Sequence, residues 1–183
     1  MKDCKDRKHQ AGNGGYSIVE LIIVIAIIAV IVATATYSVK MIFSSNAKAC
    51  ANDLQRAISD CKVTTMGKAG TGGKAGTGTF LEIFGEDSGI YSQMTIDGVE
   101  QEKQKIGSNR VSVICKKGSL ADDAAGSEDI TNGGKVKIAY DRSTGSFTKS
   151  TTDSFDTIVI KGGSKEYELK LIGLTGKTEL KLR

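Results

Sequence analysis

The distribution of apolar and polar residues divides the chain into stretches of different character. Residues 1–15 are polar, whereas residues 16–39 are almost entirely apolar and contain one charged side chain, Glu20. Residues 40–66 are apolar on one side only and contain no glycine or proline, and residues 80–183 contain short runs that alternate with period two. These periods predict one long helix followed by a set of strands.

The apolar stretch is long enough to cross a membrane. Its roughly 24 residues correspond to about 36 Å of helix, against a hydrocarbon layer of about 30 Å. Isoleucine, valine, leucine and alanine fall on every side of the expected helix, which is typical of a lipid-buried helix and not of an amphipathic surface helix. We therefore expect residues 16–39 to form a transmembrane segment.

The next stretch continues the helix with a narrower apolar face. Small and aliphatic residues recur at spacings of three and four, namely Ala47, Cys50, Ala51, Leu54, Ile58 and Cys61. The pattern predicts a helix that is continuous from Tyr16 to about Met66, with residues 40–66 packed on a globular head. An exposed coiled coil is the alternative, but alanine and cysteine are small for such a seam.

Residues 67–79 are rich in glycine and are expected to form a connecting loop. The Gly73-Lys74 pair invites comparison with a phosphate-binding loop. The comparison fails because Lys68 stands where the upstream glycine is required and Ala75 where Ser or Thr would hold magnesium. We read this segment as a loop and not as a nucleotide site.

Residues 80–183 are expected to form an antiparallel β head. Alternation is clear at Val136, Ile138 and Tyr140, and glycine-containing turns separate the runs. The expected strands cover residues 79–84, 89–96, 110–117, 136–141, 157–162, 167–173 and 178–183. Their apolar faces need a cover, which the helix seam supplies, so the predicted fold class is α+β with a long N-terminal helix packed on an antiparallel sheet.

The boundary between the polar start and the apolar segment carries a specific motif. Gly15 is followed by the aromatic Tyr16, three small or apolar residues, then Glu20 and a long apolar run. The charged leader, the boundary glycine, the glutamate five residues later and the apolar helix together resemble the type IV prepilin signature.

The resemblance implies a processing and assembly pathway. A prepilin peptidase would cleave between Gly15 and Tyr16, remove residues 1–15 as a leader and N-methylate Tyr16. The mature chain would sit in the bacterial cytoplasmic membrane as a single-pass protein with its head outside. It would then join other pilin or pseudopilin subunits, through an assembly platform, in a pilus or a type II secretion-like fibre at the cell surface.

Three departures from the commoner pattern refine the expectation. Tyr16 stands where phenylalanine is commoner, Gly14 where many leaders have Lys or Arg, and the helix lacks the proline of many major pilins. The missing proline favours a minor pilin or a pseudopilin. The order of helix, loop and consecutive hairpins also resembles the H-type minor pilins and pseudopilins, which cap the tip of the fibre.

Glu20 has a physical explanation in this setting. A carboxylate in a low-dielectric medium needs a cation, and a new α-amino group at Tyr16 is largely cationic at neutral pH. The resemblance implies that Glu20 of an incoming subunit pairs with the Tyr16 amine of a neighbour and so fixes the axial register. The alternative is a glutamate at a helix start that the macrodipole favours.

Other membrane-directed explanations remain open at this point. Ala33-Thr34-Ala35 would serve as a weak signal-peptidase site, but a discarded signal peptide or an ordinary signal anchor leaves Glu20 unexplained. The functional alternative is a monomeric membrane-anchored binding domain that is neither processed nor polymerised.

Composition argues against catalysis and against nucleic acid as the default partner. The one histidine, His9, lies in the leader, so no Ser/His or Cys/His pair survives maturation and no catalytic residue, cofactor or zinc site is expected. A net charge of +4 with sparse aromatics is weak support for nucleic-acid binding. The acidic pairs Asp122-Asp123 and Glu128-Asp129 form either a solvated loop, the favoured reading, or a calcium site.

The cysteines allow two states. Cys4 lies in the leader, and Cys50 and Cys61 are too far apart along one helix for a disulfide. In an oxidising space Cys61 or Cys50 would pair with Cys115 and join helix to sheet. Three small buried thiols are the alternative.

Overall fold

The structure is a computed structural model that describes residues 17–67, 78–117, 127–131 and 133–183. It contains two compact units, Met1–Ser38 and Val39–Arg183. We call the described part of the first unit the stem segment (residues 17–38) and the second unit the head. The leader and most of the expected glycine-rich loop lie outside the described residues.

The long helix α1 covers Ile18–Gly67, 50 residues in all, so the predicted continuous helix is confirmed. At its start the Val19 N–H donates to Ser17 Oγ at 3.3 Å, as expected of a capping serine. The helix lacks proline throughout, so none of its backbone hydrogen bonds is lost to a missing donor.

The described part of the head contains two antiparallel sheets instead of the one that the sequence predicts. Sheet A has the order β3-β2-β1-β7, with β4 also paired to β2, and sheet B has the order β10-β9-β8-β5-β6. The strands of sheet A are β1 (Phe80–Glu86), β2 (Gly89–Ile96), β3 (Val99–Glu100), β4 (Gln104–Ser108) and β7 (Lys135–Ala139). Those of sheet B are β5 (Ser112–Lys116), β6 (Glu128–Asp129), β8 (Thr157–Gly162), β9 (Lys165–Ile172) and β10 (Lys177–Leu182).

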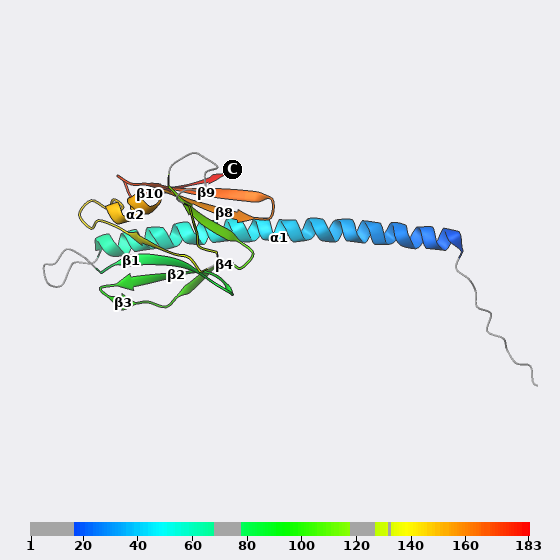
Figure 1. Ribbon diagram of the computed structural model, residues 1–183, viewed down its shortest axis with the longest axis horizontal. Coiled ribbons are helices and arrows are strands. Elements are labelled where there is room, and N and C mark those ends of the chain that lie inside the picture. The colour runs from blue at the N-terminus through cyan, green and yellow to red at the C-terminus, as the bar shows by residue number, and fades with distance from the viewer. Residues whose placement is uncertain (1–16, 68–77, 118–126, 132) are drawn as a thin grey trace, which may run out of the picture. The chain divides into compact units, whose positions relative to one another are not determined.

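The second part of α1 lies between the two sheets (Figure 1). Every member of the predicted seam is fully buried there: Ala47, Cys50, Ala51, Leu54, Ile58 and Cys61. The small residues of this seam allow close approach from both sides, because sheet A reaches Cys50 at Gly107 and sheet B reaches Ala47 at Gly162. Burial of apolar side chains from α1 and from both sheets in one core stabilises the head.

The β8–β9 hairpin packs closely against α1. A Cβ at Gly162 would lie 2.7 Å from the Ala47 Cβ and 2.6 Å from the Phe43 carbonyl oxygen, so only glycine fits. Gly163 has φ +63, and a Cβ there would lie 2.6 Å from the Lys40 carbonyl oxygen. The Ser164 N–H donates to Ser44 Oγ at 3.4 Å and fastens the hairpin to the helix.

The far end of α1 is tied to the β9–β10 turn. Lys62 Nζ donates to the Thr175 carbonyl at 2.8 Å and to the Gly176 carbonyl at 3.3 Å. The predicted alternation is confirmed nearby, since Val136, Ile138 and Tyr140 are all buried. A short helix, α2 (Lys149–Ser154), which the sequence analysis did not predict, contacts β7.

Candidate functional site

The stem segment exposes apolar side chains on all sides. Ile22, Ile23, Val24 and Ile25 are four consecutive residues that go once around the helix, and their exposed fractions are 53, 54, 47 and 56%. Exposed apolar residues continue through Tyr37, Met41 and Ile42. Such a surface has no buried face of its own, so it needs an apolar environment that lipid or other helices supply.

The hydroxyl groups of Thr34, Thr36 and Ser38 in this segment are satisfied within the helix. Thr34 Oγ1 donates to the Ile31 carbonyl, Thr36 Oγ1 to the Ala33 carbonyl and Ser38 Oγ to the Thr34 carbonyl, at 2.9 to 3.0 Å. A hydroxyl that donates to its own helix can enter hydrocarbon without an unmet donor. α1 is long and apolar enough to cross a membrane, on length and composition.

Glu20 differs from these hydroxyls. It lies exposed in the first turn of α1 and makes no hydrogen bond or ion pair with any residue that the structure describes. Its predicted partner position, Tyr16, and the predicted cleavage residue, Gly15, lie outside the described residues. The stem segment therefore combines an apolar surface with one carboxylate that lacks a partner among the described residues.

The head cysteines are free and buried. Cys50, Cys61 and Cys115 are all thiols, as in the second of the two states that the sequence allows. The pairing of Cys61 with Cys115 is not formed in this structure and stays a prediction.

Burial makes these thiols weakly acidic. Desolvation, with a smaller contribution from the Asp53 carboxylate, raises the pKa of Cys50 to about 12. Desolvation also raises the pKa of Cys61 to about 11, although a hydrogen bond with Thr65 opposes the shift. Burial raises the pKa of Cys115, and the Glu128 carboxylate contributes a smaller rise. Little thiolate forms at neutral pH, so these cysteines are poor nucleophiles and poor metal ligands.

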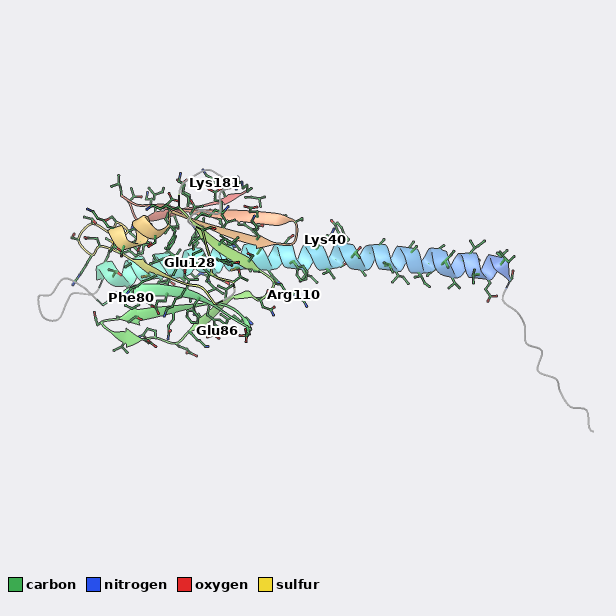
Figure 2. All side chains as sticks on the ribbon, viewed as in Figure 1. Lys40, Phe80, Glu86, Arg110, Glu128 and Lys181 are labelled. Atoms are coloured by element: carbon green, nitrogen blue, oxygen red, sulfur yellow. The ribbon has the colours of Figure 1, made fainter. Side chains whose placement is uncertain are left out.

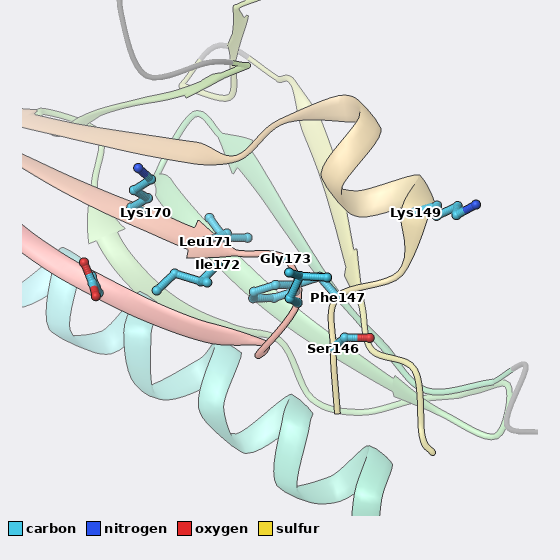
Figure 3. Close-up of a pocket in the computed structure, with 9 residues that line it drawn as sticks. Ser146, Phe147, Lys149, Lys170, Leu171, Ile172 and Gly173 are labelled. Carbon is cyan, nitrogen blue, oxygen red and sulfur yellow. The ribbon is translucent and has the colours of Figure 1, made fainter. Parts of the chain in front are cut away.

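The head has an open groove of about 720 Å³ between the loop before α2 and the end of sheet B (Figure 3). Its lining consists of Ser146, Phe147, Lys149, Lys170, Leu171, Ile172, Gly173, Leu174 and Glu179. Glu179 lies directly across from Lys170 in the β9–β10 register, so charges of both signs line the groove. This groove combines apolar and charged side chains and lacks a cysteine or histidine for nucleophilic or metal chemistry among the residues that line it.

The acidic residues give no metal centre in the part of the chain that the structure describes. No group of three or more His, Cys, Asp or Glu side chains comes together there. Asp122-Asp123 and His9 lie outside the described residues. Glu128 and Asp129 form the exposed strand β6, where Asp129 Oδ1 accepts the Thr131 N–H at 2.8 Å. In this second acidic pair the Asp129 carboxylate thus accepts a backbone N–H from the turn that follows, and Glu128 is exposed.

Comparison with protein-family models, with curated proteins and with solved structures finds no match to this chain. The functional argument therefore depends on the residues and on the two units described above. The arrangement that they support directly is an α+β protein with a long apolar N-terminal helix that could anchor it in a membrane.

Proposed function

We propose that this chain is a structural subunit of a type IV pilus-like or type II secretion-like fibre, and specifically a minor pilin or pseudopilin. Its leader is removed by prepilin peptidase between Gly15 and Tyr16, and the mature chain polymerises through the stem segment. The head presents a surface and performs no catalysis. The observation that carries the proposal is the stem segment itself, apolar on every side except for Glu20.

The physical support for the proposal is that a membrane and a fibre both provide the apolar environment that the stem segment needs. In the membrane, lipid covers the apolar surface of the stem segment, and in a fibre the stem segments of neighbouring copies cover it. A lone carboxylate in either place is costly unless it meets a cation. The amine that cleavage would create at Tyr16 supplies that cation one turn before Glu20, or on the neighbouring copy.

Processing is the first consequence to test. When the full chain is expressed together with a prepilin peptidase, we expect membrane-extracted protein to begin at Tyr16, with or without an N-methyl group. Gly15→Leu should leave the chain starting at Met1, because the peptidase requires the boundary glycine, and Gly14→Ala should be processed normally. Intact mass spectrometry distinguishes these products.

The alternative function predicts the opposite result. A monomeric membrane-anchored binding domain would retain residues 1–15 whether or not the peptidase is present. An intact Met1 in the unaltered chain beside an active peptidase would therefore overturn the proposal.

A further inference from the structure

The head meets the stem segment at a defined place in the chain. Its first residues are Val39 and Lys40, which follow directly on the apolar stretch. This inference rests on the proposed function to the extent that the stem segment spans a membrane. Given that, Lys40 lies at the level of the lipid headgroups, since it is the first charged residue after the apolar run.

Two other segments of the head pack on this same stretch of α1. The β8–β9 hairpin reaches the Lys40 carbonyl through Gly163 and fastens to Ser44 through the Ser164 N–H. The turn between β4 and β5 places the Arg110 guanidinium 5.1 Å from the centre of the Phe43 ring. Both segments are therefore near headgroup level if Lys40 is.

These two segments and the stretch of α1 on which they pack are rich in basic residues. The three segments are residues 39–47, 108–112 and 161–166, and they carry the exposed side chains of Lys40, Arg110, Lys161 and Lys165. We call these four residues the basic collar. Glu166 is the single carboxylate of the three segments, and it lies 3.3 Å from Lys161 and 3.6 Å from Arg183. Lys161 is one of these two partners, so Lys40, Arg110 and Lys165 are the collar cations that make no ion pair with a carboxylate of the described residues. The adjoining β1–β2 turn also places Glu86 and Asp87 beside Asn109, and Glu86 is paired with Lys103 at 2.8 Å.

The other end of the head differs in charge. Figure 2 shows Lys40 and Arg110 at one end of the head and Phe80 at the other. The segments near Phe80 are residues 62–67, 96–100, 141–149 and 172–177. They carry four cations, Lys62, Arg142, Lys149 and Lys177, against three carboxylates, Asp97, Glu100 and Asp141. With Glu86, Asp87 and Lys103 included, five cations stand against three carboxylates at the end that joins the stem segment, so among the described segments the net positive charge remains larger there than near Phe80.

We propose that the basic collar binds the phosphate groups of an anionic phospholipid surface. Guanidinium and ammonium groups donate charge-assisted hydrogen bonds to phosphate oxygens, and each cation near an anionic surface adds roughly a factor of five to the local association. The collar holds the head against the membrane in which the stem segment is anchored. Transfer of the subunit into a fibre would then break these contacts, so anionic lipid opposes release.

The test measures how close the collar comes to lipid headgroups. The full chain carries Cys4→Ser and Ser164→Cys, and a fluorophore is attached at position 164, whose side chain is exposed. The buried thiols do not compete for the label, for the reasons given above. The chain is reconstituted in vesicles of phosphatidylcholine alone or mixed with phosphatidylglycerol, each containing a headgroup-linked nitroxide quencher.

We expect quenching at position 164 to be at least about twofold stronger in the phosphatidylglycerol vesicles. The increase should disappear in 1 M salt, where the screening length falls to about 3 Å. Arg110→Glu with Lys165→Glu should abolish it. The matched control, Arg142→Glu with Lys177→Glu, makes the same change of net charge at the other end and should preserve it, and a label at Leu174→Cys should show no increase.

Insertion is measured separately by flotation of the vesicles after an alkaline wash. Quenching that is equal in both lipids, with insertion intact, would overturn the collar while leaving the anchoring of the stem segment in place. The same holds if both charge-reversed pairs lose the increase equally, since the effect would then reflect net charge alone. A chain that fails to float with either lipid would overturn the proposed function itself.

Discussion

Leu54→Ala is expected to lower the free energy of unfolding of the head by about 3 kcal/mol. Leu54 is fully buried on the face of α1 that packs between sheets A and B. Its truncation removes apolar contact and leaves a cavity that two sheets and a helix cannot easily close. Thermal or denaturant unfolding of the detergent-solubilised chain, followed through a head-specific spectroscopic signal, measures the change.

The matched control for this prediction is Asp60→Ala. Asp60 lies on the exposed side of the same helix, and its replacement should change the stability by less than about 0.5 kcal/mol. If Leu54→Ala were as mild as Asp60→Ala, the packing of α1 between the two sheets would be wrong.

Glu20→Ala is expected to leave the subunit inserted in the membrane but to reduce its incorporation into fibres by about a hundredfold or more. An amine at Tyr16 of a neighbouring copy would face an apolar surface without its counter-charge, and breaking a buried ion pair costs about 3 to 5 kcal/mol. The measurement compares the amount of the variant in sheared fibres with the amount in the membrane fraction. Glu20→Gln should behave in the same way, because it also removes the charge.

Asp60→Ala serves as the control here as well, because it removes a carboxylate from the head part of α1 and should incorporate normally. Normal incorporation of Glu20→Ala would rule out the pairing of Glu20 with the Tyr16 amine of a neighbouring copy. It would leave Glu20 with the alternative role of a first-turn acid that the helix macrodipole favours.

The helical half of the fold could be predicted because its signals are local and uninterrupted. A run without proline and a seam with spacings of three and four fix α1 and its buried face, and each predicted seam residue is buried. The strand positions could be predicted in the same way, because the alternation at Tyr167, Leu169 and Leu171 indicates which face of the strand is buried.

The division of the strands into two sheets could not be predicted in this way. Val113 and Val136 both point into the core, yet the first belongs to sheet B and the second to sheet A. Alternation says which side chains point inward but not which strand is the neighbour. The two-residue strands β3 and β6 are too short to show a period, and α2 has no apolar spacing that a pattern could detect.

One part of the candidate site could likewise be predicted from the sequence and another part could not. The stem segment follows from composition alone, because a helix that is apolar on every side needs no knowledge of its neighbours to be recognised. The basic collar does not, since Lys40, Arg110 and Lys165 are far apart in the sequence and meet only because the β8–β9 hairpin and the β4–β5 turn pack on the same turns of α1.

The central claim is that copies of this chain pack against one another through their stem segments. In-cell cross-linking tests it directly, with single cysteines placed in turn at Ile22, Ile23, Val24 and Ile25 of a Cys4→Ser chain, so that every side of the helix is sampled. The account predicts cross-linked dimers at one or more of these positions, because one reactive thiol in each chain joins two copies, and the dimers should disappear when Glu20→Ala is added. Monomers alone at all four positions, in cells that process the leader and assemble fibres, would contradict it.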